Sequence, residues 1–123
     1  MARTNRADRQ RAERRGRRAE TLAALHLRLK GYRILARRVR NGGGEIDLVA
    51  RRGQVVAFVE VKQRRNLDSA RQAVSLRNWQ RIARAADLWM ASRPALSASD
   101  WRYDLVTVQP FGWPRHHKDF WRP

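Results

Sequence analysis

Cysteine is absent from this sequence of 123 residues, and so is any apolar run long enough to span a bilayer. A chain without cysteine can form neither a disulfide scaffold nor a thiolate metal site. The amino terminus is basic but no apolar stretch follows it, so a secretory signal is not expected, and an arginine-rich transit peptide is the weaker alternative. We therefore expect a cytoplasmic protein of one-domain size without a membrane span.

Acidic residues are scarce as well. The chain has 11 Asp and Glu against 28 Lys and Arg, which gives a formal net charge of +17. A potential this positive attracts polyanions, and the forked guanidinium groups of arginine match pairs of phosphate oxygens. Nucleic acid is therefore the first partner that the composition indicates, and an anionic membrane surface is the second.

Composition separates an amino-terminal arm from a first helix. Residues 1–15 contain six arginines and no core-forming residue, so we expect a flexible basic arm, with its continuation into the helix as the alternative. Over 17–30 the spacing predicts a helix whose leucines form one apolar stripe: Leu22, Leu25 and Leu29. A second line on this helix carries a carboxylate among small and apolar residues: Glu20, Ala24 and Leu27.

The rest of the chain has the pattern of an α/β domain. We expect strands over 32–39, 45–51, 54–62 and 101–109, and a second long helix over 76–91. This order, α-β-β-β-α-β, predicts a mixed β-sheet flanked by helices in a domain spanning 16–109. Within the last strand, Asp104 is expected to hold an arginine or a helix amino terminus. A Pro- and Trp-rich tail follows over 110–123, and its Trp113 and Trp121 either stack on unpaired bases or pin the tail to the domain.

The two central strands hold charged residues among their valines. If the hairpin turns on Arg52-Gly53, four charged side chains share one face of the sheet: Glu45, Asp47, Glu60 and Lys62. Asp47 would be a diagonal neighbour of Glu60, and carboxylates this close repel each other unless a cation lies between them. Mg²⁺ is usually held by one or two carboxylates and would suit phosphodiester hydrolysis. The alternative is a solvated sheet face with a cross-strand salt bridge.

The same hairpin resembles a known family. "GEIDLVA" followed by "FVEVKQR" is similar to the YraN family, a bacterial group within the restriction-endonuclease-like, PD-(D/E)XK superfamily, whose relatives include the archaeal Holliday-junction resolvases. The resemblance runs from about residue 16 to residue 108 and also includes "AETLAALHLRLKGYRIL" and "RYDLVTV". It implies a restriction-endonuclease-like core built on the mixed sheet.

The resemblance also implies roles for particular residues. Asp47 and Glu60 would bind a divalent metal, Mg²⁺ or Mn²⁺, with the carbonyl of Val61 as a further ligand. Lys62 would be the catalytic lysine. Glu20 would be the helix carboxylate that completes the site, so that all four ionisable side chains are expected to be catalytic.

We therefore expect a metal-dependent, endonuclease-like protein that binds nucleic acid, DNA rather than RNA, at branched or damaged structures. Eight arginines are expected to contact phosphates: Arg14, Arg15, Arg17, Arg18, Arg64, Arg65, Arg77 and Arg81. The last two lie beside Asn78, which stands where the family has a basic residue. The alternative is a non-catalytic DNA- or RNA-binding protein with a vestigial nuclease site. Because junction enzymes commonly act as symmetric dimers, a homodimer is left open.

Overall fold

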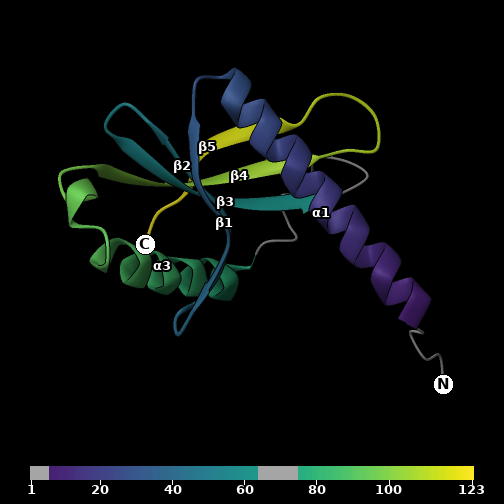
Figure 1. Cartoon of the computed structure of the whole chain (residues 1–123), viewed down its shortest axis with the longest axis horizontal. Helices are drawn as coiled ribbons and strands as arrows, with labels where there is room; N and C mark the ends of the chain where they lie inside the picture. The colour runs from purple at the N-terminus through teal and green to yellow at the C-terminus, as the bar shows by residue number, and fades with distance from the viewer. Residues whose placement is uncertain (1–5, 64–74) are drawn as a thin grey trace.

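The computed structural model describes residues 6–63 and 75–123, apart from the side chains of Asp8, Ala12 and Arg15. Its elements are α1 (Arg6–Leu29), β1 (Arg33–Asn41), β2 (Gly44–Arg52), β3 (Val55–Gln63), α3 (Leu76–Ala91), the short 3₁₀ helix η1 (Pro94–Leu96), β4 (Asp100–Val108) and β5 (Arg115–Trp121). The strands form one sheet in the order β1-β2-β3-β4-β5, with β3 and β4 parallel and the other neighbours antiparallel. α1 covers one face and α3 the other (Figure 1). The expected α/β architecture, a mixed sheet flanked by helices, is confirmed.

Side chains alternate across β3 and divide the core into two clusters. Val56 and Phe58 pack on the α3 side, whereas Ala57 and Val59 pack on the α1 side. α3 contributes large apolar residues to its cluster: Trp79, Ile82, Ala85, Ala86, Trp89 and Met90. α1 contributes mainly alanines: Ala19, Ala23, Ala24 and Leu27. Because alanine side chains are short, this face lets α1 approach the sheet closely.

α1 differs from its sequence prediction in length and in orientation. It begins at Arg6, so residues 6–15 belong to the helix rather than forming a flexible arm; arginine, alanine, glutamine and glutamate all favour helices. The predicted leucine stripe is exposed, and the line of Glu20, Ala24 and Leu27 is buried instead. Figure 1 shows the amino-terminal half of α1 projecting beyond the sheet. No helix in the described ranges is long and apolar enough to cross a membrane.

The predicted irregular tail contains a strand. Residues 115–121 form β5, which pairs antiparallel with β4, so the folded unit extends beyond the predicted limit at residue 109. The pairing register shifts between Tyr103 and Leu105, and Asp119 has a left-handed φ of 54°. These two irregularities break the alternation of inward and outward side chains, so the sequence pattern did not indicate a strand.

Asp104 on β4 fixes β5 in place. Its fully buried carboxylate accepts hydrogen bonds from His116 Nε2 at 2.7 Å and from the Asp119 N–H at 3.0 Å. Arg102 Nε donates to the same carboxylate at 2.8 Å, which confirms that Asp104 holds an arginine. Burial alone would raise the pKa of Asp104, but the hydrogen bonds from His116 and Arg102 outweigh it and hold this pKa below its usual range. Asp104 therefore has a structural role.

The β2–β3 hairpin turns on Gly53-Gln54 rather than on the expected Arg52-Gly53. Val49 pairs with Phe58, so the register is shifted by two residues from the predicted one. Gly53 has a φ of 59°, a left-handed conformation that two-residue hairpin turns need and that glycine adopts without strain. Because side chains alternate with a period of two, a shift of two leaves each residue on its predicted face.

Candidate functional site

The carboxyl groups of Asp47 and Glu60 meet where the pairing of β2 and β3 ends. The ladder between these strands stops at Leu48 and Val59, and the same register continued by one residue places Asp47 opposite Glu60 rather than diagonal to it. The two carboxyl groups are hydrogen-bonded to each other. Asp47 Oδ2 also accepts a hydrogen bond from the Val61 N–H at 2.8 Å, so a side chain rather than a backbone carbonyl satisfies this donor.

Glu60 is buried in surroundings that favour its neutral form. Burial raises the pKa of Glu60 to about 8, and the charge and hydrogen bond of Asp47 act in the same direction. Lys62 opposes the shift, with its Nζ 3.6 Å from Glu60 Oε1. With its pKa at about 8, Glu60 holds a proton near neutral pH. The position between the two groups is thus one that either a proton or a cation can neutralise.

Glu20 lines the same cleft but has a different partner. Its Oε2 accepts a hydrogen bond from Arg38 Nε at 2.7 Å. Arg38 lies on β1 with a φ of 51°, a conformation that is uncommon for a residue with a side chain and needs support from its surroundings. Across residues 6–63 and 75–123, no three Asp, Glu or His side chains form a group that could hold a metal. The structure therefore brings Asp47 and Glu60 together and leaves Glu20 beside them, bound to an arginine.

These side chains line one cleft of about 640 Å³, bounded by α1, β1 to β3 and the start of α3. Five of the eleven acidic residues of the chain lie here: Glu13, Glu20, Glu45, Asp47 and Glu60. Basic side chains line it as well: Arg17, Arg38, Arg40, Lys62 and Arg81. Glu45 is exposed and pairs with Arg40 at 3.3 Å. A cleft with acids at its floor and cations around them can attract both a metal ion and a phosphate.

A row of arginines leads out of the cleft along α3. Arg81 lines the cleft, and Arg77 joins it in a neighbouring groove that Arg84 extends. Sequence reasoning missed Arg84, although the spacing of i, i+4 and i+7 from Arg77 places the three on one helix face. Arg38 was missed too, because nothing in the pattern of β1 distinguishes it from the arginines beside it. Arg17, on α1, also lines the cleft.

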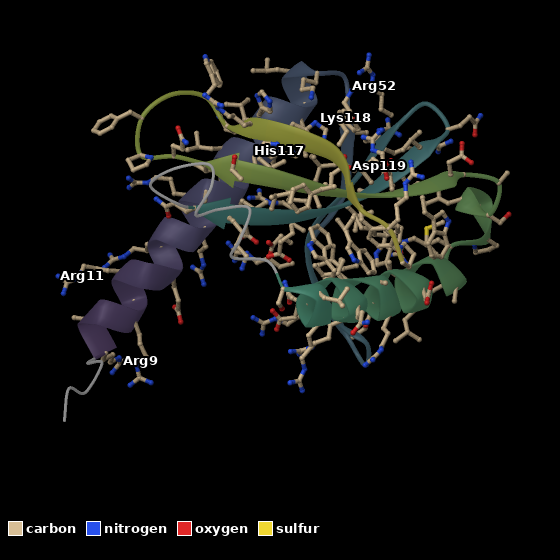
Figure 2. All side chains as sticks on the ribbon, turned by 180° about the vertical axis from the view of Figure 1, so that it is seen from behind. Arg9, Arg11, Arg52, His117, Lys118 and Asp119 are labelled. Carbon is tan, nitrogen blue, oxygen red and sulfur yellow. The ribbon has the colours of Figure 1, made fainter. Side chains whose placement is uncertain are left out.

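The remaining arginines lie farther along α1 or outside the described residues. Arg14 and Arg18 are exposed on this helix. Figure 2 shows Arg9 and Arg11 on the half of α1 that projects beyond the sheet. Three of the predicted phosphate contacts lie outside the described residues and side chains: Arg15, Arg64 and Arg65. Basic side chains are thus present both at the cleft and along the projecting helix.

Comparison with known proteins places the chain in a family. Residues 19–108 match the model of the uncharacterised protein family UPF0102. A UPF0102 protein of Chelativorans sp. (strain BNC1) is 56% identical over 111 residues, which cover 90% of each chain. Another, from Mesorhizobium japonicum, is 52% identical over 116 residues, 94% of this chain and 93% of the relative. A third, from Paramagnetospirillum magneticum, is 53% identical over 117 residues, 92% and 91% of the two chains. The protein is therefore a member of the UPF0102 family, the YraN-like family that its hairpin residues resemble.

Proposed function

We propose that this protein is a divalent-metal-dependent endonuclease that acts on DNA in the cytoplasm. The observation that carries the proposal is the neighbouring pair of carboxyl groups, Asp47 and Glu60, with Lys62 beside them where the pairing of two central strands ends. The resemblance to the restriction-endonuclease-like superfamily and to archaeal Holliday-junction resolvases supports it. That resemblance favours branched or damaged DNA as the substrate and a homodimer as the working form.

Asp47 and Glu60 would hold Mg²⁺ or Mn²⁺, with the carbonyl of Val61 as a third protein ligand. The donors fit, because hard cations prefer carboxylate and carbonyl oxygens, and Mg²⁺ is usually held by one or two carboxylates. The raised pKa of Glu60 supports the assignment, since a bound cation would displace the proton that Glu60 holds. When bound, such an ion supplies the charge that activates water and neutralises the phosphate under attack.

Lys62 and Glu20 would position the reacting groups. The ammonium group of Lys62 lies 3.6 Å from Glu60 Oε1 and carries three donors, so it can hold a phosphate oxygen or the attacking water. Glu20 holds the guanidinium of Arg38 at the cleft, where that guanidinium can meet a phosphate. Arg17 and Arg81, also at the cleft, would bind phosphates of the same strand and carry no sequence information.

Cleavage of labelled single-stranded, duplex and four-way-junction DNA with Mg²⁺ or Mn²⁺ tests the proposal. We expect metal-dependent cleavage by the wild-type protein, lost in Asp47→Asn and Lys62→Gln and retained in Glu45→Gln. Asparagine keeps an oxygen that can accept from the Val61 N–H, so the first variant should still fold. Glu45 lines the same cleft but is exposed, which makes its variant a matched control.

A non-catalytic DNA- or RNA-binding protein is the second candidate, and one observation favours it. Asp47 and Glu20 each have a protein partner without a metal, and no buried side-chain nitrogen or oxygen in the described residues lacks a hydrogen bond. On this reading the carboxyl pair is a vestigial site. Absence of cleavage of every substrate, together with tight, salt-sensitive DNA binding by all the proteins, would favour this candidate over the endonuclease.

A further inference from the structure

Two exposed aromatic rings lie on the connection between β4 and β5, residues 109–114. Phe111 is 90% exposed and Trp113 is 66% exposed. Aromatic side chains are usually at least partly buried, because they carry a large apolar surface. Two such rings presented to solvent within three residues therefore indicate a contact surface rather than part of the core.

The connection holds these rings in place. Pro114 is buried and anchors the end of the connection, while Pro110 restricts its beginning. Gly112, between the two aromatics, has a φ of 96° that a residue with a side chain would rarely adopt, so the chain turns sharply there. The Trp113 ring lies 6.4 Å from the His26 ring of α1, tilted by 35°. The two rings therefore lie on a turn that its prolines and its contact with α1 hold in place.

The connection leaves the sheet at the same edge as the candidate site. β4 runs parallel to β3, and Lys62 is the register partner of Thr107 near the end of β4. Both strands therefore end on the side of the sheet where Glu60 and Lys62 lie. Figure 1 shows the β4–β5 connection and the end of β3 at the same end of the molecule, beside α1. A DNA strand that occupied the cleft could continue across this edge to the aromatic surface.

The charge around Phe111 and Trp113 indicates which kind of molecule binds there. Arg115 follows the connection directly, and Lys30 reaches His116 at the start of β5 with its Nζ 2.6 Å from the ring Nδ1. Basic side chains here, in a chain of net charge +17, disfavour a second copy of the protein and favour a phosphate backbone. Aromatic rings beside a basic surface stack on bases, and only unpaired bases expose their faces.

We infer that Phe111 and Trp113 form a stacking surface for unpaired bases of a single DNA strand. The inference rests on the proposed function in taking DNA as the partner, but it requires neither metal nor cleavage. It adds a substrate preference to the site: the strand that enters the cleft is single-stranded next to the bond that is cut. A junction, flap or nicked end would provide such a segment, whereas an intact duplex would not.

Fluorescence anisotropy with labelled DNA, in a chelator that prevents cleavage, tests this inference. The probes are a mixed-sequence single strand and a duplex of the same length, and the variants are Phe111→Ala, Trp113→Ala, their combination and Trp113→Phe. We expect the single-strand Kd to rise roughly tenfold for each alanine, with duplex affinity and salt dependence unchanged. Phenylalanine at 113 should keep most of the affinity. Leu88→Ala, which removes an exposed apolar residue of α3, is the control and should bind like the wild type.

Two results would overturn the inference. One is unchanged single-strand binding by the double variant, or an equal loss for single strand and duplex. The other is a change in oligomeric state in sedimentation velocity on removal of the two rings, which would assign the surface to a protein contact. Failure of this test leaves the endonuclease proposal intact, because cleavage by the wild type is measured separately. Failure of cleavage likewise leaves the stacking surface intact, because binding is measured in chelator.

Discussion

A buried carboxyl group beside a half-buried one costs free energy, because Glu60 loses its water and the two groups repel when both are ionised. Asp47 recovers part of this cost by accepting a hydrogen bond from the Val61 N–H. Glu60 remains protonated up to a pH of about 8, with Lys62 as the group that opposes the raised pKa. On the proposed function, a residue kept in this state would release its proton when a cation binds. Stability, pH and metal affinity should therefore be coupled at Glu60.

Replacing Glu60 with Gln should remove a pH dependence of folding. The pKa of Glu60 in the folded protein, about 8, lies above its ordinary value of 4.5, so the folded state binds more protons than the unfolded state between these values. The contribution of Glu60 to stability is therefore fully present below about pH 4.5 and is lost as the pH rises through about 8. We expect the wild type to lose stability relative to Glu60→Gln from pH 5 to pH 8.5, by on the order of a few kcal/mol.

Urea unfolding in chelator at several pH values measures this difference. Glu45→Gln is the matched control, because Glu45 lies in the same cleft but is exposed and paired with Arg40. Its stability should follow that of the wild type across the pH range. Parallel curves for the wild type and Glu60→Gln would show that Glu60 is ionised at neutral pH, contrary to the structure described above.

At the scale of elements, the turn between β1 and β2 sets the position of the site. A Cβ added to Gly43 would lie 2.6 Å from the backbone nitrogen of Ala85 on α3, so this turn packs directly against the helix backbone. Asn41 Nδ2 also donates to the Ala85 carbonyl at 3.0 Å, and its Oδ1 accepts from the Gly43 N–H at 2.9 Å. This contact fixes the first half of β2, which carries Asp47, relative to the middle of α3. The glycine turn therefore packs closely against α3.

Gly43→Ala should therefore destabilise the fold. The new methyl group would meet the α3 backbone rather than a flexible side chain, so we expect a loss of about 1–3 kcal/mol in the free energy of unfolding. Gly42→Ala is the control, because a Cβ there would lie 3.9 Å from Leu88 Cδ1, an ordinary contact. Denaturant titration of both variants measures their free energies of unfolding. Equal stability of the two would argue against the close packing of the turn on α3.

Much of this arrangement follows from local periodicity, and the remainder depends on tertiary contacts. The alternation of β2 and β3 was enough to predict that Asp47 and Glu60 share a face, although the predicted pairing register was wrong by two residues. The leucines of α1 were predicted to form its apolar stripe, but they are exposed, because the alanine face of the helix packs on the sheet instead. β5 could not be predicted from its own residues, since a buried carboxylate of another strand, Asp104, holds it. The pairing of Glu20 with Arg38 depends on a left-handed backbone that no sequence pattern marks.

At the scale of the whole molecule, the charge is strongly asymmetric. The chain carries +17, yet five of its eleven acidic residues gather in the one cleft described above. A row of arginines, Arg77, Arg81 and Arg84, runs along α3 from that cleft, and further arginines follow the projecting half of α1 (Figure 2). This distribution would draw a polyanion to the surface around the cleft while leaving the carboxyl pair at its floor to a metal ion.

The arginine row predicts a particular salt dependence. Replacing Arg77 and Arg81 with alanine should weaken DNA binding whatever the sequence, and should reduce the slope of log K against log salt by roughly two, because each phosphate contact contributes about 0.9 for duplex DNA. The control is Arg93→Ala with Arg122→Ala, which removes the same charge away from the cleft and the α3 groove. Equal slopes for the two double variants would mean that net charge, and not the row on α3, determines binding.

The most direct test of the central claim, that Asp47 and Glu60 together hold a divalent cation, is calorimetric titration of Mn²⁺ near pH 8. The titration compares the wild type with Asp47→Asn, Glu60→Gln and Glu45→Gln, and it requires no knowledge of the substrate. We expect one tightly bound ion per chain in the wild type and in Glu45→Gln, and affinity lower by roughly tenfold or more in the other two. Equal Mn²⁺ affinity in all four proteins, or no binding by the wild type, would show that Asp47 and Glu60 do not form a cation site.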